Sequence, residues 1–416
     1  MQIEKYSIGI GDRFGHQGKA QLAAIVKAKQ AGCQIVPVWN KSYREHSIIG
    51  TVPAAVRKEA DDAVGALKWD CSYYVDADHI NMKNVDDFVE VSDFFTLDVA
   101  DYIGKKPDEA QLKEFTEAAL EYAGLLRIPD IEEQFEVTEA DIQTIGEKFL
   151  FAVKEAGRIY RHIETIKGKD NFVTEVSMDE SDAAQSPVEM FFILLMIAEE
   201  KIPVQTIAPK FTGRFNKGVD YVGDAAKFEK EFNQDIAVIN YAIEQFGLPG
   251  NLKLSIHSGS DKFAIYGPIN EAIKKFNAGL HLKTAGTTWL EELIGLAEAG
   301  GDGLEIAKEI YARSLTKFDE LCAPYATVID IDKNDLPDSG VVEQWDGKHF
   351  ADVLRHDQSC ADYNPNVRQL LHVGYKIAAQ MGEQFTRALV KHEKVIAEHV
   401  AENIFQRHIK PVFLDG

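Results

Sequence analysis

The chain has 416 residues and a formal net charge of -22, with 45% hydrophobic and 27% charged side chains. This composition is that of a globular protein with a large core, and the negative charge argues against nucleic acid and against an anionic membrane as partners. The N-terminus lacks the basic and then apolar pattern of a signal peptide, and the four scattered cysteines form no CxxC pair. We therefore expect a cytoplasmic protein with free thiols.

Short apolar stretches alternate with helical patterns along the chain. We expect strands at residues 6–10, 34–39, 73–75, 171–177, 203–208, 252–256, 280–282 and 325–330. Residues 84–170 have helical patterns and no good strand, which indicates a helical insertion after the third strand. Eight strands alternating with helices predict a single α/β domain over residues 1–416, a (β/α)8 barrel of the TIM type, with a C-terminal helical segment at 364–416 packed on the barrel. The alternative is an open doubly wound sheet.

Polar side chains gather where the predicted strands end, and the carboxyl ends of barrel strands share one mouth. The clearest case is the stretch Lys253–Lys262, where an alternating strand is followed by His, Ser, Gly, Ser, Asp and Lys. Buried charges without partners are costly, so we expect a bound cation and an anionic substrate at this mouth. The strand ends supply Asp12, Arg13, His16, Lys41, Arg44, Asp76, Asp78, His79, Glu175, Ser177, Lys210, His257, Asp261, Lys262, His281, Lys283, Thr284 and Asp330.

Three of these strand ends carry a histidine, namely His79, His257 and His281. Three imidazoles with open coordination positions suit zinc, manganese, cobalt or nickel. We therefore predict that they bind a divalent metal cation, although a single histidine at a strand end is more often structural. His16 is a fourth candidate ligand, but its glycine-rich surroundings fit a substrate-binding loop equally well.

Two carboxylates, Asp78 and Glu175, lie on different predicted strands and could act on a substrate from opposite sides. The apolar strand before Glu175 would keep its carboxyl group protonated more often, and the alternative is that one of the two is a metal ligand or a salt-bridge partner. Cationic side chains could hold a substrate carboxylate, an arginine doing so in bidentate fashion. The predicted substrate-binding residues are Arg13, His16, Lys41, Lys210, Asp261, Lys262 and Lys283.

Several segments together match one known family. They are Gly9–Gly15 (GIGDRFG), Asp76–His79 (DADH), Glu175, Ser255–Lys262 (SIHSGSDK) and His281–Trp289 (HLKTAGTTW). In these segments the chain resembles the tagaturonate/fructuronate epimerase family. The resemblance implies a divalent-metal-dependent isomerase that interconverts D-tagaturonate and D-fructuronate in hexuronate catabolism. It also implies His79, His257 and His281 as metal ligands, Asp78 as proton acceptor and Glu175 as proton donor.

The reaction implied by this resemblance leaves two chemical routes open. The inverted carbon is beta to the ketone, so the carbonyl does not directly acidify its hydrogen. One route is retro-aldol cleavage, rotation of the aldehyde and re-addition, and the other is deprotonation and reprotonation at carbon. Two other functions fit the same residues: a metal-dependent aldolase or isomerase acting on a sugar acid or sugar phosphate, and a non-enzymatic sugar-acid binding protein.

Overall fold

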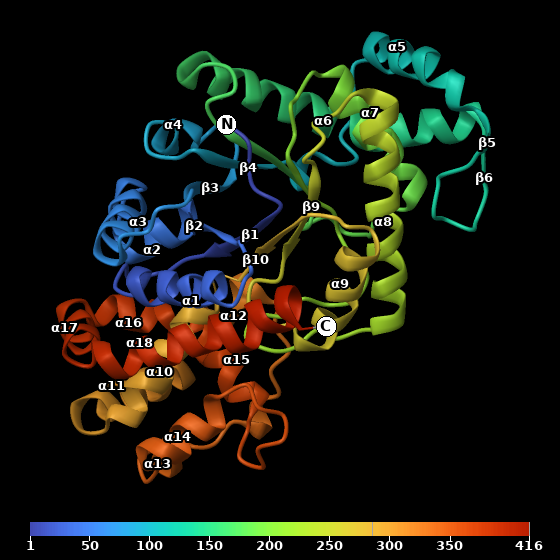
Figure 1. The fold of residues 1–416 in the computed structure, drawn as a ribbon. Helices are drawn as coiled ribbons and strands as arrows, with labels where there is room; N and C mark the ends of the chain where they lie inside the picture. Colours follow the sequence, from blue (N-terminus) through green and yellow to red (C-terminus); the bar gives the residue numbers. More distant parts are fainter. Residues whose placement is uncertain (285, 416) are drawn as a thin grey trace.

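The computed structural model describes residues 1–284 and 286–415 and contains a closed barrel of parallel strands wrapped by helices (Figure 1). The strand order around the barrel is β1-β10-β9-β8-β7-β4-β3-β2. The predicted (β/α)8 fold is therefore confirmed. The barrel strands are β1 (Tyr6–Ile10), β2 (Val36–Ser42), β3 (Tyr74–Ile80), β4 (Phe94–Asp98), β7 (Val173–Ser177), β8 (Thr206–Ala208), β9 (Lys253–His257) and β10 (Leu280–Lys283).

Two strand assignments made from the sequence are wrong. β4 lies inside the segment predicted to contain no strand, and it pairs with β3 on one side and β7 on the other. The predicted strand at 325–330 is instead the end of a short 3-10 helix, η3 (Ala323–Tyr325), and an irregular loop. That loop is held by the side chain of Gln369, which accepts from the Asp330 backbone at 2.8 Å. The long insertion thus follows the fourth strand and not the third.

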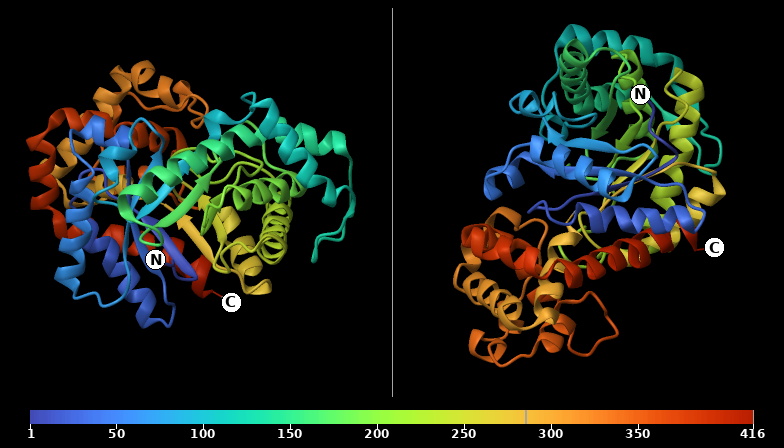
Figure 2. Two further views of the ribbon diagram at one scale, coloured as in Figure 1. Left: turned by 90° about the horizontal axis from the view of Figure 1, so that it is seen from above. Right: turned by 60° about the vertical axis from the view of Figure 1, so that its left-hand side comes forward.

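The insertion contains helices and a small antiparallel pair of strands. Its longest element, α6 (Glu139–Lys167), begins at a capping box formed by Thr138 and Asp141 and buries one apolar face. The insertion and the C-terminal helices lie at opposite sides of the barrel (Figures 1 and 2). Besides α6, the segment holds α4 (Val85–Phe88) before β4, and η1 (Ala100–Tyr102), α5 (Glu109–Ala119), η2 (Leu120–Tyr122), β5 (Gly124–Leu126) and β6 (Phe135–Val137) after it.

The helices that follow the strands cover the outside of the barrel. The most apolar of them, α7 (Pro187–Glu199), is capped by Ser186, whose side chain accepts from the Glu189 backbone. It packs between α6 and α8 (Ala225–Phe246). Within the described residues, no helix is long and apolar enough to cross a membrane. The other helices of this layer are α1 (Gly18–Gln30), α2 (Tyr43–Ile49), α3 (Ala54–Leu67), α8 (Ala225–Phe246) and α9 (Phe263–Lys275).

The last third of the chain is a layer of helices on one side of the barrel (Figure 2). Its final two elements, α18 (Glu393–Glu402) and η5 (Asn403–Leu414), pack against α1, α9 and α10 (Thr287–Ala299). All four cysteines of the chain are free. The elements of this layer are α10 (Thr287–Ala299), α11 (Gly301–Thr316), α12 (Phe318–Cys322), η3, η4 (Lys333–Asp335), α13 (Ser339–Val342), α14 (Gly347–Leu354), α15 (Pro365–Val373), α16 (Tyr375–Met381), α17 (Glu383–Lys391), α18 (Glu393–Glu402) and the π-helix η5 (Asn403–Leu414).

Candidate active site

The ammonium group of Lys283, at the end of β10, lies at the centre of the barrel mouth. Its Nζ is 2.8 Å from Asp76 Oδ2, 3.0 Å from Asp78 Oδ1 and 3.1 Å from Glu175 Oε1. It also donates to Thr96 Oγ1 at 2.6 Å. The Lys283 side chain is 5% exposed, so one buried cation is surrounded by three carboxylates from β3 and β7.

A glycine on β1 makes room for this lysine. The register of β1 and β10 places Gly9 opposite Lys283. A Cβ atom on Gly9 would lie 2.8 Å from Lys283 Cγ, closer than real contacts allow. Packing against the buried lysine therefore explains a glycine in the middle of a strand, where it would otherwise weaken the sheet.

The charges of this cluster act strongly on one another. Burial alone would lower the pKa of Lys283, but the surrounding carboxylates, Asp76 first, outweigh it and raise that pKa well above its ordinary value. Burial alone would raise the pKa of Glu175, but Lys283 and His257 outweigh it and hold that pKa well below its ordinary value. Burial raises the pKa of Asp76 to about 7. Lys283 and His257 thus favour the ionised form of Glu175, the opposite direction to the one expected from the apolar strand before it.

Two imidazoles and a third carboxylate converge beside the cluster. His79, Asp179 and His257 each offer a ligand atom, and these atoms all lie within 4.8 Å of one another. Asp179 Oδ2 is 3.1 Å from His257 Nδ1 but out of line for a hydrogen bond. Among the described residues, neither this Nδ1 nor that of His79 has a hydrogen-bond partner. Such a donor set of two nitrogens and one oxygen fits a divalent transition metal.

The second nitrogen of His257 supports this interpretation. His257 Nε2 lies 2.8 Å from Glu175 Oε1, and the Glu175 side chain is 0% exposed. A carboxylate that holds the far nitrogen of a histidine is the usual partner of a metal-binding imidazole, because it fixes the tautomer and the ring orientation. In this structure, therefore, Glu175 orients His257 and contacts Lys283.

The backbone of β3 is irregular at His79. This residue has φ 53, a left-handed conformation that costs a non-glycine residue on the order of 1–3 kcal/mol. The pairing of β3 with β4 shifts register between Ala77 and Ile80, as bulges near active sites do when they redirect a side chain. The result is an imidazole whose ring centroid lies 5.1 Å from that of His257 and whose Nδ1 lies 3.4 Å from Asp98 Oδ2.

The third predicted ligand, His281, lies deeper in the barrel. It is opposite Ser7 of β1 and Ser255 of β9, whereas Lys283, two residues further, is opposite His257. Its fully buried ring places Nδ1 2.9 Å from Ser7 Oγ. The structure brings His79 and His257 together with Asp179 and not with His281.

A cleft leads from solvent to these groups. An inner cavity of about 140 Å³ is lined by Arg13, Asp78, His79 and Lys283, among others. An outer cavity of about 410 Å³ adjoins it and includes Lys210 in its lining. Both cavities are lined by Arg44, Asp179, Glu180, Lys217, His257 and Tyr325, so they form one continuous cleft.

The other predicted substrate-binding residues lie outside this cleft. His16 lines a separate groove beside α18. Lys41 is buried and donates to the Arg13 backbone carbonyl at 2.5 Å. Asp261 and Lys262 are 0% exposed, and Lys262 Nζ donates inward to the backbone carbonyl of Val219 at 2.8 Å.

Asp261 joins the loop after β9 to the C-terminal helices. Its Oδ2 accepts from Arg368 Nη2 at 2.8 Å and lies 3.0 Å from His356 Nδ1. Its Oδ1 lies 3.2 Å from His408 Nε2. Burial would raise the pKa of Asp261, but Arg368 and the two histidines hold it well below its ordinary value. This carboxylate therefore anchors the loop that follows His257.

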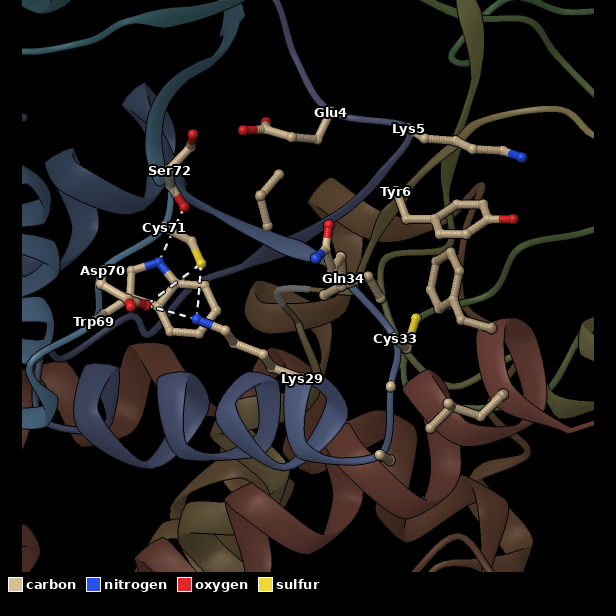
Figure 3. Close-up of a pocket in the computed structure, with 16 residues that line it drawn as sticks. Glu4, Lys5, Tyr6, Lys29, Cys33, Gln34, Trp69, Asp70, Cys71 and Ser72 are labelled. Atoms are coloured by element: carbon tan, nitrogen blue, oxygen red, sulfur yellow. Dashed lines mark hydrogen bonds and ion pairs between the residues drawn. The ribbon is translucent and has the colours of Figure 1, made fainter.

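Another cavity, of about 870 Å³, lies at the opposite end of the barrel (Figure 3). It is lined by residues at or near the N-terminal ends of β1 and β2, including Tyr6 and Gln34. In Figure 3, Lys29 points toward Asp70 and Cys71, with Nζ 2.6 Å from Asp70 Oδ1. Barrel enzymes carry their chemistry at the carboxyl ends of the strands, so this cavity is separate from the site.

The fold and the mouth together define a (β/α)8 barrel protein with a possible two-histidine, one-aspartate metal site. The family model for UxaE, tagaturonate epimerase, matches residues 1–412, and the chain belongs to this family of epimerases. It is 28% identical over 421 residues to the tagaturonate/fructuronate epimerase of Thermotoga maritima, covering 97% of this chain and 80% of that protein.

Solved structures share the fold. A glycerol-complexed crystal structure of the fructuronate-tagaturonate epimerase UxaE from Cohnella laeviribosi matches 99% of this chain and 82% of that one, with a TM-score of 0.80 and 23% identity. The native crystal structure of the same protein matches with a TM-score of 0.79 and 22% identity. The barrel and its added helices are thus common to these proteins.

Proposed function

We propose that this protein is a divalent-metal-dependent epimerase that interconverts D-tagaturonate and D-fructuronate in hexuronate catabolism. Membership of the epimerase family supports the reaction. The observation that carries the metal dependence is the convergence of His79, Asp179 and His257 beside Asp78 at the barrel mouth.

The metal would be held by His79, Asp179 and His257, with zinc, manganese, cobalt and nickel as the candidates. Bound there, it would supply a Lewis acid that stabilises negative charge developing on substrate oxygens. Glu175 would keep the His257 ring in position through its contact with Nε2.

Asp78 is the proposed proton acceptor. It lines the inner cavity and its side chain is 15% exposed, so a bound substrate can reach it. Lys283 contacts the same carboxylate at 3.0 Å and favours its ionised form, which is the form a base needs. Glu175 is the proposed proton donor, and it would act through Lys283 and His257, since these two groups lie between it and the cavity and hold its carboxylate ionised. One of them would pass its proton to the substrate while Glu175 stabilises the charged form of that group.

The direct test is an NMR assay of D-tagaturonate with protein loaded separately with each candidate metal. We expect D-fructuronate to accumulate to equilibrium without net cleavage, a chelator to stop the reaction, and added divalent cation to restore it. Net cleavage into smaller fragments would favour a metal-dependent aldolase instead. Binding without turnover by metal-loaded protein would leave a sugar-acid binding protein.

Two substitutions test the proposed roles of the carboxylates. Asp78→Asn and Glu175→Gln keep the side-chain shape and remove proton exchange, so each should lower kcat by roughly 10²- to 10⁴-fold. Asp78→Asn should retain the metal, since Asp78 is not a proposed ligand, and loss of metal there would make it one. Glu175→Gln should bind the metal about 10- to 100-fold more weakly, because Glu175 holds the His257 ring, so its kcat is measured at saturating metal. Near-normal kcat in both variants would show that the roles are assigned wrongly.

A further inference from the structure

The cationic side chains that line the cleft differ in their partners. Arg13 pairs with Glu45 at 2.8 Å, and Lys283 is surrounded by carboxylates. Arg44 and Lys217 also line the cleft, yet across residues 1–284 and 286–415 neither forms an ion pair. The inner cavity therefore contains two positive charges that no acidic side chain of the described chain neutralises.

Lys217 approaches the cleft from the loop that follows β8. Its backbone N–H donates to the Val328 carbonyl at 2.8 Å, which fixes the loop. A Cβ atom on Gly259 would lie 3.4 Å from Lys217 Nζ, so the ammonium group rests against the loop two residues beyond His257. Gly259 has φ +65, a conformation that favours glycine, and the absence of a side chain leaves this space to the lysine.

Arg44 approaches the cleft from the other side, at the start of α2. Its guanidinium lies 5.2 Å from the centroid of the Tyr325 ring, a cation–π contact that orients it without neutralising it. The Tyr325 hydroxyl is 3.0 Å from that of Tyr375, which steadies the ring. Arg44 and Lys217 therefore line the same inner cavity, one from the first turn of α2 and the other from the loop after β8.

We propose that Lys217 and Arg44 bind the carboxylate of the sugar-acid substrate and set the preference for sugar acids over neutral sugars. This inference rests on the proposed function, which supplies the substrate class. The net charge of -22 opposes the approach of an anion, so affinity has to come from local cations. Glu180 also lines the cleft, and its negative charge repels a substrate carboxylate, which increases the need for unpaired cations there. With the carboxylate held there, the rest of the sugar extends toward Asp78 and His79.

Paired lysine substitutions test this proposal. Lys217→Met should lower kcat/KM for D-tagaturonate by about 10- to 100-fold, the range of one charge-assisted hydrogen bond, mainly by raising KM. Lys217→Arg keeps the positive charge and should recover most of the loss, and Arg44→Met should behave like Lys217→Met. Lys376→Met is the matched control, because Lys376 Nζ also lies over the Tyr325 ring, at 4.9 Å, but does not line either cavity.

The ratio of kcat/KM for D-tagaturonate to that for neutral D-tagatose distinguishes charge recognition from a structural role. The proposal requires this ratio to fall in Lys217→Met and to stay unchanged in Lys376→Met. An equal loss on both sugars, or no loss on either, would overturn it.

Binding measurements separate this proposal from the proposed function. If the wild-type protein does not turn over D-tagaturonate, the epimerase assignment fails. Calorimetric binding affinities for D-gluconate and for neutral D-glucitol then test whether the two cations recognise a carboxylate. The wild-type protein should then bind gluconate more tightly than glucitol, and Lys217→Met should lose that preference. A wild-type protein without such a preference, or a variant that keeps it, would refute the carboxylate site.

Discussion

Replacing Lys283 with methionine would remove the only lysine or arginine found within salt-bridge distance of Asp76, Asp78 and Glu175 among the described residues. Methionine keeps most of the chain length and the apolar contacts of the lysine stem. The change therefore isolates the ammonium group. We expect the folded protein to be destabilised, because the carboxylates would remain buried without their compensating charge.

The size of the effect follows from burial. Asp76 and Glu175 have 0% exposed side chains and Lys283 only 5%, so breaking the pairs should cost about 3–5 kcal/mol, as for other buried ion pairs that lose one partner. For a chain of 416 residues, an unfolding entropy of about 2.1 cal/mol/K per residue amounts to roughly 0.9 kcal/mol/K. The midpoint of thermal unfolding should therefore fall by roughly 3–6 °C.

Differential scanning fluorimetry at neutral pH measures this shift. Lys210→Met is the matched control, since Lys210 lines the outer cavity and forms no ion pair with the described residues, and its Tm should stay within about 1 °C of the wild-type value. Adding Asp76→Asn to Lys283→Met should recover part of the loss, because one uncompensated charge is removed. An unchanged Tm in Lys283→Met would refute the argument that this ammonium compensates the buried carboxylates.

Three further outcomes can be checked separately. Asp179→Ala should lose bound metal while His281→Asn retains it, as measured by elemental analysis of dialysed protein; the opposite result would restore His281 as the ligand. Gly9→Ala should displace the Lys283 side chain and lower Tm and kcat together, because the added Cβ would lie 2.8 Å from Lys283 Cγ. Burial lowers the pKa of His46 from 6.5 to about 4, so the unfolded chain binds a proton more readily than the folded protein does. The contribution of the neutral His46 ring to folding stability is therefore complete above pH 6.5, and it is lost as the pH falls from 6.5 to 4. His46→Gln should therefore reduce the slope of Tm against pH in that window, and an unchanged slope would contradict this origin.

The barrel could be predicted from the sequence, but not all of its strands. Alternation of apolar strands and helical patterns identifies seven of the strands, because each is bounded by polar loops. The pattern does not identify β4 for two reasons. Phe94 and Phe95 are both fully buried, so apolar and polar residues do not alternate along the strand. The strand also lies inside an acidic, mostly helical segment. Residues 325–330 are apolar and β-branched enough to suggest a strand, but only Tyr325 and Ile329 are buried, and Ala326, Thr327 and Asp330 are exposed in an irregular loop.

The part of the candidate site that lies at strand ends can be predicted from the sequence. His79, His257, Asp78 and Lys283 end their strands and do meet at the mouth. Depth in the barrel is not visible in a sequence, so the pattern of strand ends groups His281 with His257, although His257 lies one layer nearer the mouth. The strand pattern does not identify Asp179, because this residue lies in the loop beyond Ser177, although its acidic surroundings (Asp179-Glu-Ser-Asp182) indicate that the loop carries charge.

The order of synthesis adds a consequence to the anchoring of Asp261. Its partner Arg368 lies 107 positions later in the chain, and His408 belongs to the final helix. At about 5–20 residues per second, a ribosome makes Arg368 roughly 5–20 s after Asp261. The barrel strands are therefore all synthesised well before the loop beside His257 can be fixed. In a nascent chain that lacks Arg368 and His408, the loop after β9 at the barrel mouth would not yet be anchored. The complete binding site for metal and substrate would therefore form only after these residues are synthesised.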